Sequence, residues 1–303
     1  MNRLADTVKA IERVILGKTL QVRLCLTCIL ARGHLLIEDV PGVGKTTLAH
    51  TLAQVLGLEW TRVQFTSDML PADIVGVSIF DRTTGKFQFR RGPVFTQLLL
   101  ADEVNRASPK AQSALLEAME ERQVTVDGAT YPLPEPFFVV ATQNPHEQIG
   151  TFGLPESQLD RFLMRISLGY PDPASERKVL LQAERREMMG RTPAVLCAED
   201  VLSLQRAARD VHVAEPLLDY VQALVARSRA QLSLGLSPRA AQGLLRAAQA
   251  WAFLGGDTAV LPEHVQAVFP AIAAHRLEPR ESDGGSDGRE IADGIVQAVP
   301  VPV

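Results

Sequence analysis

The sequence predicts an α/β protein with a parallel sheet covered by helices on both faces, followed by a small all-helical domain. Two observations predict this fold class. Short apolar runs alternate with helical periodicity from residue 34 to residue 168, a pattern typical of parallel strands joined by helices. From residue 173 to residue 274 the periodicity is helical throughout, which indicates a second domain made of helices.

The composition is that of an ordinary folded protein. Of 303 residues, 31 are Lys or Arg and 35 are Asp or Glu, which leaves a formal charge of −4, and 46% are hydrophobic. Intrinsic disorder is therefore excluded as the main state, and no chain-wide basic field favours nucleic acid. No apolar run reaches the roughly 18 residues that a membrane span needs, and charged residues interrupt the N-terminus. We expect no membrane insertion and a cytoplasmic location.

The elements of the first region follow from local patterns. Helical spacing covers residues 4–15 and 20–30, and a strand is expected at 34–37 before a helix at 45–56. Further strands are expected at 62–65, 98–101, 137–142 and 162–168. Further helices are expected at 109–121 and 155–160. Two segments break the rhythm as alternating hairpins, 77–90 around Thr84-Gly85 and 123–131 around Asp127-Gly128.

The second region divides into helices near 174–189, 199–211, 216–231, 238–254 and 262–274. A polar, glycine-rich stretch at 281–288 indicates a flexible linker, and the apolar spacing after it indicates a short docking helix. We therefore expect an α/β core with N-terminal helices at 1–170, a helical domain at 171–280, and the linker and docking helix at 281–303.

A phosphate-binding loop is expected between the first strand and its helix. Residues 41–46 read Pro-Gly-Val-Gly-Lys-Thr, and there successive backbone N–H groups and the helix N-terminus can surround a polyphosphate. Lys45 would reach the β and γ phosphates, and the Thr46 hydroxyl would bind Mg²⁺. The full GxxxxGK[ST] pattern has glycine where this sequence has Asp39. The residues expected to bind nucleotide are Pro41, Gly42, Val43, Gly44, Lys45, Thr46, Thr47 and Asp102.

Acidic and amide residues end the next two apolar strands. Asp102 and Glu103 follow Leu98 to Ala101, where Asp102 can hold Mg²⁺ and Glu103 can orient or deprotonate the water that attacks the γ-phosphate. Asn144 follows the strand at 137–142 and can position that water or sense the γ-phosphate. The alternatives are a solvated helix start for the acidic pair and a turn role for Asn144.

The order of these motifs resembles the AAA+ ATPases, which implies a P-loop NTPase core with two hairpin insertions and a helical lid. Stretches such as VPGVGKT, LLLADEVNRASPKAQSALLEAMEERQVTVDG and LPESQLDRF resemble the MoxR family, of the group with a hairpin inserted in the second helix. The resemblance implies that Arg161 is an arginine finger entering the ATP site of a neighbouring subunit. It also implies that Arg239, in Ser-Pro-Arg at 237–239, is the sensor that touches nucleotide from the lid.

The resemblance further implies a function. An ATP hydrolase using ATP and Mg²⁺ would work as a homo-oligomeric, hexameric ring and drive chaperone-like remodelling, maturation or activation of client protein complexes. Partners carrying von Willebrand A domains are expected, and a nucleic-acid partner is not. A nucleic-acid-dependent motor is the main alternative, with the pI of 5.9 and Asp127 at a hairpin tip against it. An ATP-sensing scaffold without productive turnover is the other, with Glu103 against it.

The first hairpin is the place where a partner surface is expected. Four basic residues face one acidic residue there, a local excess of three positive charges, although a charged hairpin is most often simply solvated. These residues are Arg82, Lys86, Arg90 and Arg91 against Asp81.

Overall fold

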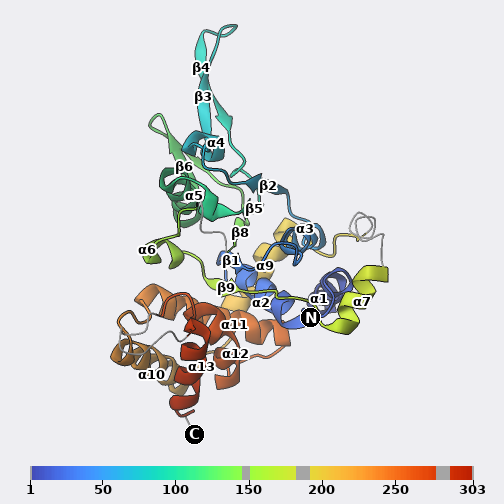
Figure 1. Cartoon of the computed structure of the whole chain (residues 1–303), viewed down its shortest axis with the longest axis vertical. Coiled ribbons are helices and arrows are strands. Elements are labelled where there is room, and N and C mark those ends of the chain that lie inside the picture. The colour runs from blue at the N-terminus through green and yellow to red at the C-terminus, as the bar shows by residue number, and fades with distance from the viewer. Residues whose placement is uncertain (1, 145–150, 182–191, 278–286, 302–303) are drawn as a thin grey trace.

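A computed structural model describes residues 2–144, 151–181, 192–277 and 287–301. Its centre is a five-stranded parallel sheet in the order β2-β5-β8-β1-β9 (Figure 1). The strands are β1 Leu35–Glu38, β2 Trp60–Gln64, β5 Leu98–Asp102, β8 Phe138–Gln143 and β9 Met164–Ile166. Strands β5 and β8 are buried along almost their whole length, as continuous apolar runs require in a sheet covered on both faces. The predicted α/β class is confirmed.

Successive strand residues point to opposite faces and enter two separate hydrophobic clusters. Leu35 and Ile37 of β1 belong to one cluster, whereas Leu36 belongs to the other. Helices α1 Asn2–Val14, α2 Thr19–Leu30 and α3 Lys45–Val55 contribute to the first cluster. On the opposite face lie α4 Pro71–Val75 and α5 Pro109–Glu121, which pack against each other in the second. A short 3₁₀ turn, Val104–Arg106, links β5 to α5.

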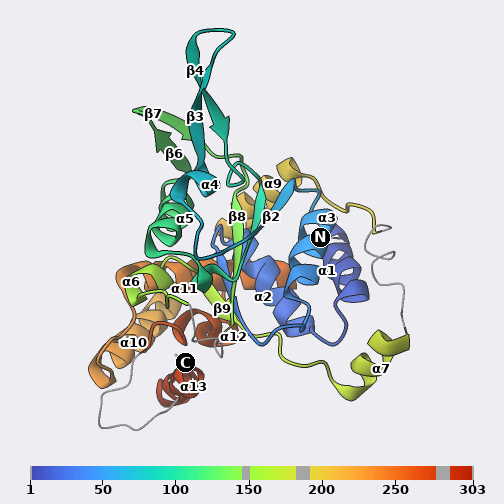
Figure 2. The ribbon, with the colours of Figure 1, turned by 45° about the horizontal axis from the view of Figure 1, so that its top comes forward.

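Both expected hairpins are present. The first consists of β3 Gly76–Asp81 and β4 Lys86–Arg91, and the second of β6 Gln123–Val126 and β7 Ala129–Pro132. The long β3-β4 hairpin projects from the body, with β6-β7 beside its base (Figures 1 and 2). Phe89 of β4 stacks on Tyr131 of β7 with ring centroids 4.2 Å apart. The two hairpins are therefore joined through their side chains.

The elements described after β9 are helices, and residues 182–189 of the helix expected near 174–189 lie outside the described residues. Helix α6 Glu156–Leu159 precedes β9, and α7 Pro173–Leu181 follows it. The remaining helices are α9 Ala198–Arg209, α10 Glu215–Gln231, α11 Pro238–Gly255, α12 Pro262–Ala273 and α13 Gly288–Ala298. Helix α13 packs on α12 and α10 and buries Ala292 and Ile295, as expected of a docking helix. Most of the predicted linker lies outside the described residues. No described helix combines the length and the apolar character needed to cross a bilayer.

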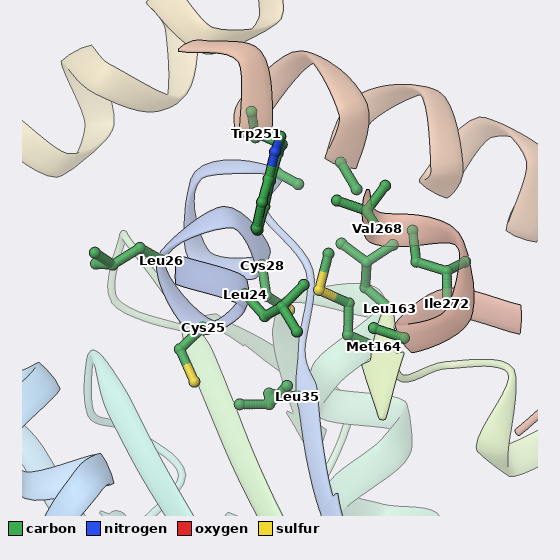
Figure 3. Close-up of a cluster of buried hydrophobic side chains, with 14 of the residues drawn as sticks. Leu24, Cys25, Leu26, Cys28, Leu35, Leu163, Met164, Trp251, Val268 and Ile272 are labelled. Atoms are coloured by element: carbon green, nitrogen blue, oxygen red, sulfur yellow. The ribbon is translucent and has the colours of Figure 1, made fainter. Parts of the chain in front are cut away.

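One hydrophobic cluster joins the sheet to the later helices. Helix α2 lies between the strands and α11, and it contacts α11 and α9 directly. Figure 3 shows side chains of α2, β1, the β9 region, α11 and α12 meeting there: Leu24, Cys25, Leu26, Cys28, Leu35, Leu163, Met164, Trp251, Val268 and Ile272. This one cluster contains residues from both sides of residue 170. The domain boundary expected at residue 170 therefore stays a prediction.

A buried histidine, His34, lies at the amino-terminal edge of the sheet, just before β1. The Val139 N–H donates to His34 Nδ1 at 3.0 Å, and His34 Nε2 lies 3.2 Å from the Met119 carbonyl oxygen. The ring is therefore neutral, with its proton on Nε2. Burial lowers the pKa of His34 to about 4, and burial together with the Arg276 and Arg165 charges lowers the pKa of His275 well below its usual range.

We predict that His34 makes the protein acid-sensitive. The unfolded chain binds a proton at His34 near pH 6.5, whereas the folded chain binds one only near pH 4, so stability falls as pH drops from 6.5 towards 4. His34→Gln should reduce the slope of unfolding free energy against pH in that window by up to about 1.4 kcal/mol per pH unit. Urea unfolding at several pH values measures the slope. His212→Gln, at an exposed histidine, is the matched control, and equal slopes in all three proteins would contradict the assignment.

Candidate functional site

The loop after β1 leaves its backbone uncovered. Gly42 and Gly44 have φ values of 84° and 95°, a left-handed region that favours glycine. A Cβ atom added to either glycine would meet no atom within 4 Å, so the strain on φ, and not crowding, requires glycine in this structure. Lys45 begins α3, and its ammonium donates to the Asp39 carbonyl oxygen at 2.5 Å.

Asp39, which replaces the glycine of the full loop pattern, anchors the loop. Its Oδ1 accepts from the Val40 N–H at 2.8 Å. Its Oδ2 accepts from the N–H groups of Leu168 and Gly169 at 2.7 and 2.6 Å, and from the Ser167 hydroxyl at 3.0 Å. The departure from the pattern therefore ties the start of the phosphate loop to the segment that follows β9.

A cavity of 430 Å³ opens beside the loop. Its walls come from the end of α1 and the residues after it, from the phosphate loop, from the segment after β9 and from α7. The lining residues are Val14, Ile15, Leu16, Lys18, Gly42, Val43, Gly44, Thr47, Leu168, Tyr170, Pro171 and Glu176. Val14, Ile15 and Leu168 give it apolar surface next to the side-chain-free backbone of the loop. Such a mixture suits a ligand with one flat apolar part and one anionic part.

Asp102 ends β5 as a buried carboxylate with both oxygens engaged. The Thr142 hydroxyl donates to Oδ1 at 2.6 Å. The Arg62 guanidinium donates to Oδ2 through Nη2 at 2.7 Å and through Nε at 3.1 Å. The charge of Asp102 is thus compensated by an arginine of the neighbouring strand β2, two residues before Gln64, which parallel pairing places opposite Asp102.

Glu103 lies next to Asp102 in an uncommon backbone conformation. Its φ of 56° and ψ of 49° are left-handed, which costs a non-glycine residue energy and occurs often at functional sites. The Glu103 N–H donates to the Thr142 hydroxyl at 2.9 Å. Its carboxylate accepts from Gln64 Nε2 at 2.7 Å and pairs with Arg106 Nε at 3.1 Å. Thr142 therefore fixes both acidic residues relative to β8.

Strand register brings the predicted motifs to one edge of the sheet. Glu38 of β1 pairs with Gln143 of β8, and Ala101 of β5 pairs with Ala141 of β8, all in parallel. The phosphate loop, the acidic pair and the buried Asn144 each follow directly from the carboxyl end of one of these strands. Ligands of parallel sheets bind at this edge.

The two arginines assigned by resemblance lie elsewhere and lie together. Arg161 pairs with Glu120 of α5 at 3.1 Å and donates to the Leu116 carbonyl at 2.8 Å. Arg239, in the first turn of α11, pairs with the same Glu120. Neither arginine lines the cavity at the phosphate loop. The expectation that Arg239 touches nucleotide from the lid stays a prediction, and in this conformation its side chain pairs with Glu120 of α5.

Comparisons with known proteins identify the family of the chain. The model of the ATPase family associated with various cellular activities (AAA) matches residues 34–164, and an AAA lid domain model matches residues 224–295. Chaperone MoxR1 of Mycobacterium tuberculosis is 41% identical over 91% of this chain and 76% of its own. The chain belongs to the MoxR family of AAA ATPases. The YeaC protein of Bacillus subtilis is 45% identical over 99% of this chain and 95% of its own.

A solved structure extends the likeness of this MoxR-family chain to three dimensions. A crystal structure of a Cytophaga hutchinsonii protein superposes with a TM-score of 0.91 at 37% identity, covering 100% of this chain and 96% of the other. The lid match begins within α10 and ends within α13, so the docking helix belongs to the lid of the family.

The residues of this MoxR-family site fit a nucleotide and Mg²⁺. The glycines present a backbone cradle that side chains would fill, and Thr46 and Asp102 are oxygen donors of the kind that Mg²⁺ prefers. Sequence reasoning missed Arg62 and Thr142, which hold Asp102. No local pattern in the sequence marks either residue, because each contact joins residues of different strands.

Proposed function

We propose that the protein hydrolyses ATP at the carboxyl edge of its sheet. The observation that carries this proposal is that register places the phosphate loop, Asp102 with Glu103, and Asn144 at the ends of three adjacent strands. Lys45, which begins the helix after the loop, is the cation for the β and γ phosphates. Thr46 and Asp102 would hold Mg²⁺, which supplies positive charge against the charge that develops on the transferred phosphoryl group.

Glu103 is the base or water-orienting group in this proposal. In the described conformation its carboxylate is engaged by Gln64 and Arg106, so it must leave at least one of these partners to accept a proton from water. Its left-handed backbone and the bond from its N–H to Thr142 hold the residue beside Asp102. Asn144 completes the edge as a group that both donates and accepts hydrogen bonds.

We infer that neighbouring copies complete the site. Arg161 and Arg239 meet on Glu120, and neither lines the cavity of its own chain. In a ring Arg161 would meet the nucleotide held by the adjacent copy, where a guanidinium stabilises developing phosphate charge. Arg239 would touch nucleotide from the lid. The proposal therefore includes a homo-oligomeric ring, and the resemblance to the family implies a hexamer.

The work driven by hydrolysis is proposed to be the remodelling, maturation or activation of client protein complexes in the cytoplasm. Two observations support a protein client. The projecting hairpin exposes Phe80 and Phe87 as an aromatic pair at 5.3 Å, with Phe87 74% exposed, and apolar exposure of this kind suits a protein partner. The relative from Mycobacterium tuberculosis is named a chaperone. Partners with von Willebrand A domains remain part of the proposal.

We predict that Glu103→Gln binds ATP but does not hydrolyse it. Amide replacement keeps the shape of the side chain and removes the proton acceptor, so kcat should fall about 100-fold or more with near-normal ATP affinity. Lys45→Ala should instead weaken ATP binding by about tenfold or more, because a charge-assisted contact is lost. Calorimetric titration with ATP and phosphate-release assays separate the two effects.

The matched control for this experiment is Glu263→Gln, at an exposed glutamate in the first turn of α12. It should bind and hydrolyse ATP as the wild type does. Wild-type turnover in Glu103→Gln would overturn the assignment of Glu103. Stimulation of hydrolysis by DNA that salt abolishes would favour the nucleic-acid motor instead.

We predict that Arg161→Ala loses ATPase activity, by about 1,000-fold or more, while ATP binding persists. Mixing Arg161→Ala with Lys45→Ala protein should restore part of the activity, because the first supplies an intact phosphate loop and the second an intact Arg161. Mixing Lys45→Ala with Glu103→Gln should restore no activity, because each substitution inactivates the ATP site of the chain that carries it. Absence of recovery in the first mixture, with mixed assemblies demonstrated, would contradict a shared site.

A further inference from the structure

A pocket lined by arginines lies at the opposite edge of the sheet from the phosphate loop. Its volume is 330 Å³, and it is bounded by the end of α2, the end of α5, α9 and α11. Residues 30–32 precede strand β1, whereas the phosphate loop follows it. With about 3.3 Å per residue, the four-residue strand alone separates the two places by about 13 Å. The pocket is therefore distinct from the site proposed for ATP.

The side chains of this pocket are arranged as a basic rim over a buried floor. Leu30, Ala31, Gln205 and Ala208 form the floor and are all less than 9% exposed. The rim carries four guanidinium groups from four different helix regions, and no residue that lines the pocket is acidic. These groups belong to Arg32, Arg122, Arg209 and Arg246.

Little negative charge compensates the rim. Glu135 pairs with Arg32 at 3.4 Å, and the Arg122 guanidinium donates to the Arg32 carbonyl oxygen at 3.1 Å. No carboxylate among the described residues pairs with Arg209 or Arg246. One carboxylate against four guanidinium groups leaves an excess of three positive charges around a cavity.

The charges of the rim act on one another. Burial and the neighbouring Arg32 lower the pKa of Arg122. Burial, with the charges of Arg209 and Arg239, lowers the pKa of Arg246. Like charges gathered around one cavity repel one another, and an anion in the cavity would offset that repulsion, so the pocket favours anion binding on electrostatic grounds.

We propose that this pocket binds a small molecule through a diphosphate group. A phosphate carries about 1.5 to 2 negative charges near pH 7, so two phosphates match the three uncompensated positive charges. Guanidinium groups pair with phosphate through two parallel hydrogen bonds, so arginine side chains suit such a ligand. The volume lies within the usual range for small-molecule sites, roughly 300 to 1,000 Å³. Free pyrophosphate and a nucleoside diphosphate are the two sources of this group.

Binding there would connect parts of the protein that the proposed ATPase uses. Arg122 ends α5 in a left-handed conformation, and its carbonyl oxygen accepts from the Leu133 N–H at 3.0 Å, at the root of the β6-β7 hairpin. Arg246 belongs to α11, the helix that also carries Arg239. An anion shared by Arg122 and Arg246 would therefore hold α5, α11 and the base of that hairpin together.

Calorimetric titration with pyrophosphate tests the proposal, in a Lys45→Ala background that weakens binding at the phosphate loop. We expect one pyrophosphate per chain, with affinity that falls as salt rises. Adding Arg246→Gln or Arg122→Gln should weaken binding by about tenfold or more for each lost bidentate contact. Arg206→Gln is the matched control, because Arg206 is exposed on α9 and does not line the pocket.

Thermal unfolding supplies a readout that a purely structural role would not move. Arg246→Gln should keep or raise the Tm in buffer without phosphate, since repulsion is relieved, and should abolish the rise in Tm that pyrophosphate causes. Equal titrations with ADP would assign the site to the diphosphate alone, and tighter Arg246-dependent binding of ADP would assign it to a nucleotide. The proposal would be overturned if pyrophosphate did not bind, or if Arg246→Gln bound it equally well. It would also be overturned if a DNA oligonucleotide or an acidic peptide bound in an Arg246-dependent way and pyrophosphate did not.

Discussion

Parallel pairing of β1, β5 and β8 is the constraint on which the candidate site depends. Because the three strands run in one direction and in register, the loops that leave their carboxyl ends share one edge of the sheet. Thr142 then links β8 to both Asp102 and Glu103 through a single hydroxyl. A shift of β8 by one residue would turn this hydroxyl to the other face and separate the acidic residues from their support.

A second set of contacts joins the sheet to the lid. Asp160 accepts from Arg276 Nε at 2.7 Å and from the hydroxyl of Ser237, which caps α11. Arg276 is buried and also donates to the Phe162 and Leu163 carbonyl oxygens. The residue next to Asp160 is Arg161, the proposed arginine finger. The contacts of Asp160 with Ser237 and Arg276 therefore hold Arg161 in place relative to α11 and the end of α12. A movement of the lid would therefore shift the position of Arg161.

The sequence predicts best where local chemistry decides the structure. Strands β5 and β8 are continuous apolar runs, and α5 begins at Pro109 after the capping residue Ser108, so both kinds of element were expected within one or two residues. Contacts between distant segments were out of reach. Neither the pairing of Arg62 with Asp102 nor that of Arg276 with Asp160 leaves a periodic signal, because each depends on how strands and helices pack.

The same distinction applies to the site. The phosphate loop and the acidic pair are recognisable because each motif is contiguous and follows a strand. Asp39 was visible only as a departure from a pattern, and its role as an anchor to residues 167–169 emerges from the fold. The meeting of Arg161 and Arg239 on Glu120 joins three segments of the chain and likewise required the structure.

Phosphate release by the purified wild-type protein, followed at increasing protein concentration with ATP and Mg²⁺, tests the central claim most directly. If ATP is held at the carboxyl edge and its hydrolysis is completed by a neighbouring copy, release should require Mg²⁺ and the activity per chain should rise with concentration. An absence of phosphate release at every concentration, including those at which the chains assemble, would contradict the account.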